Sequence, residues 1–229
     1  MTNSRRVLLV VLCLIFTFGI APEINAQYLH PKLQKKTVTI RQAVILPAKI
    51  EIVKESAKGS EMMIAQSEEI SKAVSAAVLK TLEEKKIGVI KDSFQPADLD
   101  ESRKYQLADI QSRYDALLPQ LMKKSKDVKK ARFTLGDEVM LLNVDKSTDI
   151  LVFIRGTGRV FTKGKTAFSL INIFSLDFPL AQITVGIVDA HSGEVLAFTK
   201  PLTATKALKD PKSLSKMITK SLKKLPQSS

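Results

Sequence analysis

Apolar positions along this chain follow two periodicities, one typical of strands and one typical of helices. Runs rich in β-branched residues predict strands, whereas apolar residues spaced three and four apart predict amphipathic helices. The strand-like runs lie at residues 37–53, 89–90, 148–161, 181–189 and 194–202, and the helical patterns at 61–86, 102–122 and 211–225. This order predicts an α/β (α+β) fold, with helices packed on a single mixed sheet over residues 37–226.

Two prolines interrupt these patterns. Pro47 falls inside the run 37–53, which we expect to form one long strand or two strands bent around it. Pro119 falls inside the second helical region, where we expect it to kink the helix or to open a new one. A third, short helix is expected near residues 133–142.

The segment 148–161 predicts a strand in the core. Ile150, Val152 and Ile154 alternate with Leu151 and Phe153, so both faces are apolar, as in a strand that is covered on both sides. Arg155 and Arg159 follow, and we expect them to mark the place where the strand leaves the core.

The last helical pattern has two interpretations. Its apolar stripe is Leu214, Met217, Ile218, Leu222 and Leu225, and lysines cover the opposite side. A membrane-surface helix has this character. We favour a terminal helix docked on the sheet, because a stripe of this width is needed to cover one face of a sheet.

The segment GIVDAHSGEVLAF, residues 186–198, places Asp189, His191, Ser192 and Glu194 close together. Strand-like sequence lies on both sides, so DAHSG is expected to connect a late β-hairpin, with Gly193 supplying a positive φ. Catalysis would need a nucleophile, a base and an orienting group around a pocket. One tight turn cannot easily supply that arrangement, and we interpret the stretch as a turn.

Residues 1–26 have the pattern of a signal peptide. Two arginines precede an apolar run of about 15 residues, which is shorter than the roughly 20 that a membrane-spanning helix needs, and cleavage is expected after Ala26. The alternative is an uncleaved N-terminal anchor. Cys13 lies inside the apolar run, which argues against lipid attachment. We expect an exported protein of the periplasm or of the inner face of the outer membrane, with residues 27–36 as an exposed lead-in.

The chain is basic, with 36 Lys and Arg against 23 Asp and Glu and a formal charge of +13. Outside the inner membrane, the expected anionic partners are lipopolysaccharide, anionic phospholipid and acidic proteins. Nucleic acid is disfavoured, because no Trp and three Tyr leave little surface for base stacking. The densest basic run, 123–132, is either a solvated face or an anion-binding patch. The candidate patch residues are Lys123, Lys124, Lys126, Lys129 and Lys130.

Motifs of common enzymes are absent from the sequence. It has no phosphate-binding loop of the GxxxxGK[ST] type and no GxSxG elbow. His30 and His191 are the only histidines and the mature chain would have no cysteine, which makes a zinc site unfavourable. We therefore predict no enzyme activity, no catalytic residues, no cofactor and no metal site, although carboxylate pairs distant in sequence stay open as a third hypothesis.

The segment 167–180 (AFSLINIFSLDFPL) is unusually apolar for a connection between two strands. One interpretation is a buried connection in the core. The other is an exposed apolar surface that contacts a partner or the membrane. For the second interpretation the candidate contact residues are Phe168, Leu170, Ile171, Ile173 and Phe174.

Several segments together resemble a group of envelope proteins. They are AVILPAKI (43–50), DILVFIRGTGRV (149–160), VGIVDAHSGEVL (185–196) and a final LSKMITKSLKKLP helix (214–226). The chain resembles the curli-secretion lipoprotein, the penicillin-binding-protein activator lipoproteins and the N-terminal domain of the Tol β protein. The resemblance implies an α/β sandwich that acts through protein contacts at the cell envelope. Many members of this group are lipoproteins, whereas this chain lacks a convincing lipid-attachment cysteine.

The sequence therefore predicts an exported, non-enzymatic envelope protein that acts as a binding or assembly factor through protein contacts. The alternative is a peripheral protein that binds anionic lipid or lipopolysaccharide through the apolar segment 167–180 and the lysines of 123–130.

Overall fold

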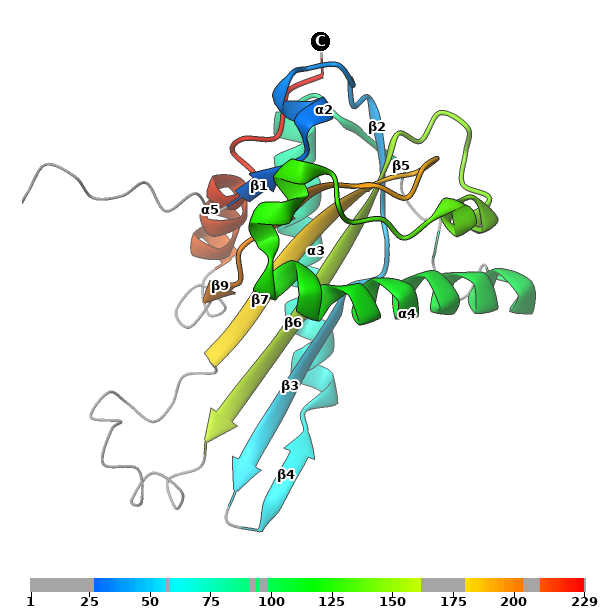
Figure 1. Ribbon diagram of the computed structural model, residues 1–229. Coiled ribbons are helices and arrows are strands. Elements are labelled where there is room, and N and C mark those ends of the chain that lie inside the picture. Colours follow the sequence, from blue (N-terminus) through cyan, green and yellow to red (C-terminus); the bar gives the residue numbers. More distant parts are fainter. Residues whose placement is uncertain are drawn as a thin grey trace, which may run out of the picture.

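The computed structural model describes residues 27–56, 58–90, 94, 99–161, 180–203 and 211–228 (Figure 1). In this part of the chain, strands form one mixed nine-stranded sheet with helices on both faces, which confirms the predicted α/β class. The strands are β1 (Gln27–Leu29), β2 (Gln42–Ile45), β3 (Lys49–Ser56), β4 (Gly59–Met62), β5 (Gly88–Ile90), β6 (Ile150–Phe161), β7 (Leu180–Asp189), β8 (Val195–Thr199) and β9 (Leu202–Thr203). The helices are α2 (Pro31–Gln34), α3 (Ile64–Glu84), α4 (Glu101–Lys123) and α5 (Pro211–Ser221), with 3₁₀ helices η1 (Ser125–Lys130) and η2 (Asp137–Leu142).

The long strand β6 is the centre of the sheet. The main strand order is β1-β8-β7-β6-β2-β5, and β3 also pairs with β6, while β4 pairs with β3 and β9 with β7. Both β2 and β3 run parallel to β6, one after the other, with Pro47 between them. Proline has no N–H for the ladder, so the ladder is interrupted at that residue. The expected pair of strands around Pro47 is confirmed.

Alternation along β6 divides its side chains between two hydrophobic cores. Ile150, Val152 and Ile154 belong to the core beneath α3 and α5, whereas Leu151 and Phe153 belong to the core beneath α4, η1 and η2. All five side chains are fully buried, which confirms the predicted strand and both of its apolar faces.

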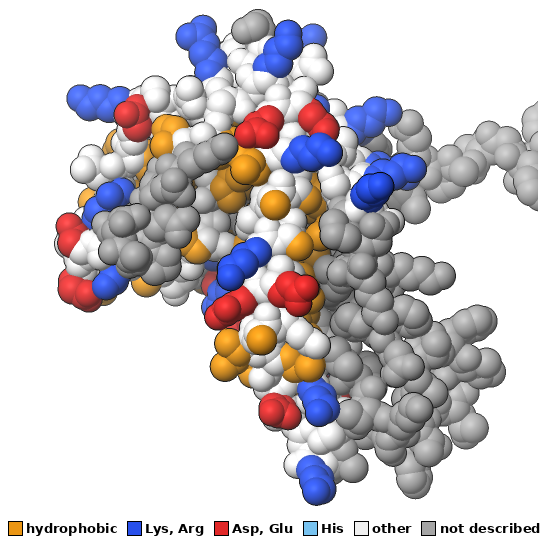
Figure 2. All heavy atoms as spheres, turned by 180° about the vertical axis from the view of Figure 1, so that it is seen from behind, with side chains coloured by type: hydrophobic (Ala, Val, Ile, Leu, Met, Phe, Trp, Pro, Cys, Tyr) orange, Lys and Arg blue, Asp and Glu red, His pale blue; other side chains and the backbone are white. Residues whose placement is uncertain are grey.

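The helices α3 and α5 form the layer behind the sheet. The C-terminal stripe lies in the core beneath them, with Leu214, Ile218 and Leu222 buried and Met217 partly buried. The hydroxyl groups of Thr81 and Thr219 are hydrogen-bonded at 3.0 Å and join the two helices. Figure 2 views the molecule from behind and shows cationic and anionic side chains interspersed on this side. The predicted docking of the terminal helix on the sheet is confirmed.

Two details of the opposite layer differ from the expectations. The helix α4 continues through Pro119 to Lys123, so no new helix begins there, and the alternative expectation of a kink stays a prediction. The proline removes a single main-chain N–H donor close to the end of the helix. In 133–142, only Asp137–Leu142 is helical, as a 3₁₀ helix. The preceding residues are extended because they pair with the late hairpin: Leu135 N–H donates to Gly193 O at 2.9 Å.

The expectation of an exposed lead-in at 27–36 is wrong. Residues 27–29 form β1, which pairs antiparallel with β8, and Gln27, Tyr28, His30 and Leu33 are buried. The side-chain oxygen of Gln27 accepts a hydrogen bond from the Lys224 N–H at 3.1 Å. The pairing partner lies near the other end of the chain, so the local polar pattern of 27–36 could not indicate the burial.

The late hairpin is confirmed as a turn. Asp189 Oδ1 accepts hydrogen bonds from the main-chain N–H groups of His191 and Ser192, at 2.9 and 2.8 Å. Gly193 has a φ of +68°. The carboxylate of Asp189 therefore holds the turn, as an Asx turn does.

Gly186 on β7 is required by the packing of Tyr114. A Cβ atom at this position would overlap the Tyr114 hydroxyl and lie 2.7 Å from Cζ of its ring. Tyr114 cannot easily move, because it is fully buried and stacked on Phe153 with ring centroids 4.2 Å apart.

We predict that Gly186→Ala lowers the free energy of unfolding by about 1–3 kcal/mol through overpacking, measured by urea denaturation. Tyr114→Phe alone should change stability by less than about 1 kcal/mol, because the Tyr114 hydroxyl is buried without a hydrogen-bond partner among the described residues. Combined with Gly186→Ala, it should recover part of the loss. Purely additive effects would contradict this packing argument.

His30 makes the folding stability depend on pH. Its Nδ1 accepts a hydrogen bond from the Lys32 N–H at 3.1 Å and caps α2. Burial lowers the pKa of the imidazole. Since the unfolded chain then binds the proton more readily, the stability from neutral His30 is present above about pH 6.5 and is lost as the pH falls through the lower folded pKa.

We expect His30→Asn, which keeps a capping acceptor, to weaken the fall in stability between about pH 7 and about pH 5 in denaturation experiments. His191→Asn, in the exposed turn, is the matched control and should leave the fall unchanged. An unaltered pH dependence in His30→Asn would exclude this role for His30.

Candidate functional site

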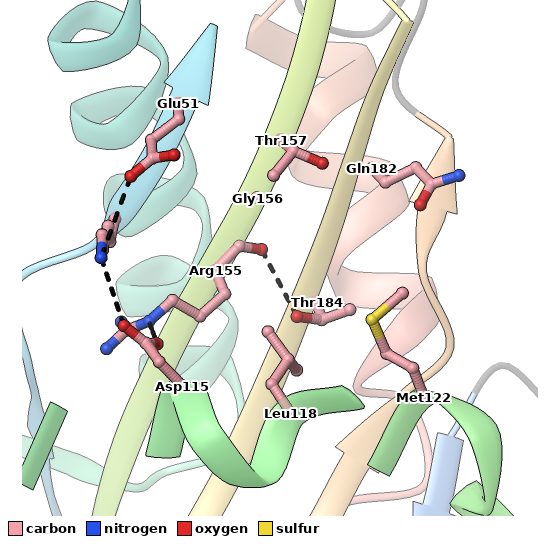
Figure 3. Close-up of a pocket in the computed structure, with 10 residues that line it drawn as sticks. Glu51, Asp115, Leu118, Met122, Arg155, Gly156, Thr157, Gln182 and Thr184 are labelled. Carbon is pink, nitrogen blue, oxygen red and sulfur yellow. Dashed lines mark hydrogen bonds and ion pairs between the residues drawn. The ribbon is translucent and has the colours of Figure 1, made fainter. Parts of the chain in front are cut away.

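A pocket of about 240 Å³ lies beneath α4, where the helix crosses the sheet. The strands β3, β6 and β7 extend past α4, and the pocket sits at this crossing (Figure 1, Figure 3). The sheet contributes Lys49, Glu51, Arg155, Gly156, Thr157, Gln182 and Thr184, and α4 contributes Asp115, Leu118 and Met122.

Strand alternation explains why this sheet face changes character along its length. Beneath α4, β6 presents Leu151 and Phe153 to the core. Two and four residues further on, the same face carries Arg155 and Thr157. The face is therefore apolar under the helix and polar beyond it, and the pocket lies at the transition.

Arg155 is the central charged residue of the pocket. Its side chain is 5% exposed, and its Nε donates to Oδ1 of Asp115 in a charged hydrogen bond. Its Nη1 donates to the main-chain oxygen of Ile154 at 3.0 Å, whereas Nη2 is buried without a partner among the described residues. A charge of this kind is stabilised in a folded protein only when it is paired, and Asp115 supplies the pair.

Opposite charges alternate along the rim of the pocket. Lys49 Nζ lies 3.3 Å from Oδ2 of Asp115 and 3.8 Å from Oε1 of Glu51. Two cations and two anions thus line the pocket in one connected network, so the site carries no large net charge (Figure 3).

The aromatic rings of Tyr114 and Phe153 support the guanidinium group from the side of the core. The Cζ of Arg155 lies 5.5 Å from the Tyr114 ring centroid and 5.8 Å from that of Phe153. Cation–π attraction and the carboxylate together fix Arg155 in place. Burial raises the pKa of the Tyr114 phenol far above its ordinary value, so this group stays neutral.

The lining residues are suited to binding. The hydroxyl groups of the pocket belong to Thr157 and Thr184, and Thr184 Oγ1 donates to the main-chain oxygen of Arg155 at 3.4 Å. A nucleophile needs a base within hydrogen-bond reach, and neither hydroxyl has one among the described contacts. The pocket instead offers apolar surface from Leu118 and Met122 beside amide and hydroxyl groups.

A second candidate site is the basic surface at the β1 edge of the sheet. We use this name for Lys123, Lys124, Lys126, Lys129, Lys130, Arg132 and Lys200. The five lysines predicted from the sequence are all exposed, at the end of α4 and along η1. The structure adds Lys200 at the end of β8, whose Nζ lies 5.8 Å from the ring centroid of Tyr28 on β1.

The predicted apolar contact residues Phe168, Leu170, Ile171, Ile173 and Phe174 lie outside the described residues. Within the described ranges, no group of three or more His, Cys, Asp or Glu side chains could hold a metal ion. No helix in this part of the chain combines the length and apolarity that crossing a membrane requires.

The pocket was not predicted from the sequence. Arg155 was expected to mark the place where the strand leaves the core, whereas the residue is buried, with 4% of its surface exposed. Its partner Asp115 lies 40 residues earlier in the sequence, and nothing in the helical pattern distinguishes Asp115 from the other polar residues of α4. The signal that was available is the position of an arginine directly after an unbroken apolar strand, which indicates a buried charge that needs a partner.

No protein-family model and no curated protein matches this chain. Among solved structures, the chain is similar to the dodecamer of a PelC point variant from Paraburkholderia phytofirmans, with 8% identity and a TM-score of 0.35 over 83% of this chain and 90% of that chain. A second PelC dodecamer from the same organism has 10% identity and a TM-score of 0.36, over 89% and 96% of the two chains. Similarity at this level carries no argument about function, and the resemblance to the group of envelope α/β proteins stays a prediction.

The ion pair of Arg155 and Asp115 should stabilise the fold more than a surface pair does. Asp115→Ala leaves a buried guanidinium without its counter-charge, and we expect a loss of about 2–4 kcal/mol in the free energy of unfolding. The double variant Arg155→Met with Asp115→Leu removes both charges and should be more stable than Asp115→Ala. A loss below about 1 kcal/mol for Asp115→Ala, as in exposed pairs, would contradict the importance of this pair.

Proposed function

We propose that this chain is an exported, non-enzymatic protein of the cell envelope that binds or assembles other proteins through direct contacts. The observation that carries the proposal is the pocket beneath α4. It offers a small apolar hollow beside a polar sheet face, which suits an apolar side chain flanked by the main chain of a partner.

The size of the pocket supports a side chain as its occupant. Sites for cofactors and drug-sized ligands have volumes of roughly 300–1,000 Å³, whereas this pocket has about 240 Å³. Anchor residues of protein interfaces are large side chains that fill small pockets near the centre of the contact. Leu118 and Met122 would contact such an anchor, and Met122 is 43% exposed.

The surroundings of the pocket support recognition of a polypeptide. Gln182 and Thr157 are exposed beside the hollow and supply amide and hydroxyl groups. Main-chain N–H and C=O groups of a partner need such hydrogen-bond partners when they lose water. The fixed Arg155 and the stacked rings behind it keep the wall in place, which lowers the entropy lost on binding.

The export part of the proposal is supported by the signal-peptide pattern of residues 1–26. The expected cleavage after Ala26 would keep Gln27–Leu29, which form β1, in the mature chain. Cleavage there would leave the buried strand intact.

The test is photocrosslinking from the pocket in cells that export the protein. A photoreactive amino acid at Gln182 should crosslink to one protein, and mass spectrometry should map the crosslink next to a large apolar residue of that protein. Thr157→Phe fills the pocket from an exposed position and should reduce the crosslink about tenfold, the effect of roughly 1.4 kcal/mol.

Ser112→Phe is the matched control, because Ser112 is exposed on α4 and does not line the pocket. It should leave the crosslink unchanged, and both variants should keep the native melting temperature. A crosslink that resists Thr157→Phe would exclude the pocket as the contact. A chain found inside the cytoplasm, with its N-terminal segment intact, would exclude export with cleavage.

A further inference from the structure

The basic surface at the β1 edge brings together residues from three distant parts of the chain. Lys126 and Lys129 lie on η1, Lys200 follows β8, and Tyr28 lies between them on β1. The Nζ atoms of Lys129 and Lys200 are 6.0 and 5.8 Å from the centroid of the Tyr28 ring. Antiparallel pairing of β1 with β8, which places Tyr28 opposite Phe198, produces this convergence.

Few acidic side chains offset these charges. Asp127 is the only acid in residues 120–134, its side chain is 19% exposed, and it is already paired with Lys130 at 3.2 Å and Arg132 at 3.7 Å. Among the described residues, Lys123, Lys124, Lys126, Lys129 and Lys200 form no ion pair with an acid. As far as the described residues go, this surface therefore carries more positive charge than its acidic side chains offset.

Part of this charge has a structural explanation. Cations near the C-terminus of a helix stabilise its dipole, and Lys123 and Lys124 lie at the end of α4. Lys129 likewise lies in the last turn of η1, but the explanation does not extend to Lys126, in the first turn of η1, or to Lys200, which follows β8.

The pKa of the Tyr28 phenol depends on burial and on the lysines around it. Burial raises its pKa, but hydrogen bonds from Ser125 and Lys200 and the charges of Lys200 and Lys126 lower it, and the lowering is the larger total effect. The neighbouring lysines therefore favour negative charge on the Tyr28 oxygen.

We propose that the basic surface at the β1 edge binds the phosphate groups of an anionic membrane. The cations around Tyr28 are lysines, which act as compact and mobile point charges, whereas planar carboxylates are bound most specifically by the fork of an arginine. Clusters of four to eight basic residues are typical of contacts with anionic lipid. This inference does not depend on the proposed function of the pocket, which lies on other residues.

The test is flotation of the exported protein with vesicles. The protein should bind vesicles that contain phosphatidylglycerol, bind phosphatidylcholine vesicles much more weakly, and dissociate as salt is added. Each lysine near an anionic surface contributes about a fivefold factor in affinity. The variant Lys126→Gln, Lys129→Gln and Lys200→Gln should therefore bind roughly a hundredfold more weakly.

The matched control is Lys72→Gln, Lys80→Gln and Lys146→Gln, which removes the same charge from exposed residues outside this surface. It should bind within about threefold of the native protein, because Lys72 and Lys80 lie on α3 and Lys146 precedes β6, outside the surface proposed to contact the vesicle. Equal losses in both triple variants would overturn the proposal in favour of non-specific attraction.

Two further arms distinguish the source of the anion. Millimolar inorganic phosphate should compete only weakly with vesicles, because a single phosphate engages few of the lysines at once. Complete displacement by inorganic phosphate would assign the site to a free anion and overturn the membrane as its partner. Binding of polyglutamate as tight as that of phosphatidylglycerol vesicles would assign it to an acidic protein instead.

Discussion

The charged hydrogen bond between Arg155 and Asp115 is the interaction on which the site depends. Moving a guanidinium out of water costs several kcal/mol, so an arginine on the central strand requires a carboxylate beside it. Asp115 comes from α4, and the pair therefore fixes the helix against β6 at one position along the sheet. Leu118 and Met122 lie one and two turns further along α4, where they line the pocket. The pocket is a consequence of where this pair forms.

Local patterns predicted the elements that bury their own apolar faces. The unbroken apolar run from Ile150 to Ile154 specified β6, which is covered on both faces, and the spacing of Leu214, Ile218 and Leu222 specified the terminal helix, which is covered on one face. The Asp189 turn was also readable, since an Asx turn and a glycine of positive φ are chemical requirements of a short connection.

Features that depend on distant pairing could not be read from local sequence. The polar segment 27–36 gave no indication of burial, because β1 pairs with β8 from the other end of the chain. Lys200 could not be assigned to the basic surface for the same reason. The identity of the acid that pairs with Arg155 could not be read either, because Asp115 lies 40 positions away in the sequence. In each case the sequence shows the polarity of the residue, but its neighbours in space depend on which strands pair in the sheet.

The helix α4 and the turn after it connect both candidate contacts. Its residues Leu118 and Met122 line the pocket, and Lys123 and Lys124, the next residues, begin the basic surface. Because α4 is close-packed on the sheet, the pocket residues and the lysines at its end keep a fixed arrangement relative to each other. If the lysines bind a membrane, the pocket would therefore face a fixed direction relative to that membrane. A partner anchored in the same membrane would meet the pocket at a raised effective concentration, which strengthens binding without adding any contact.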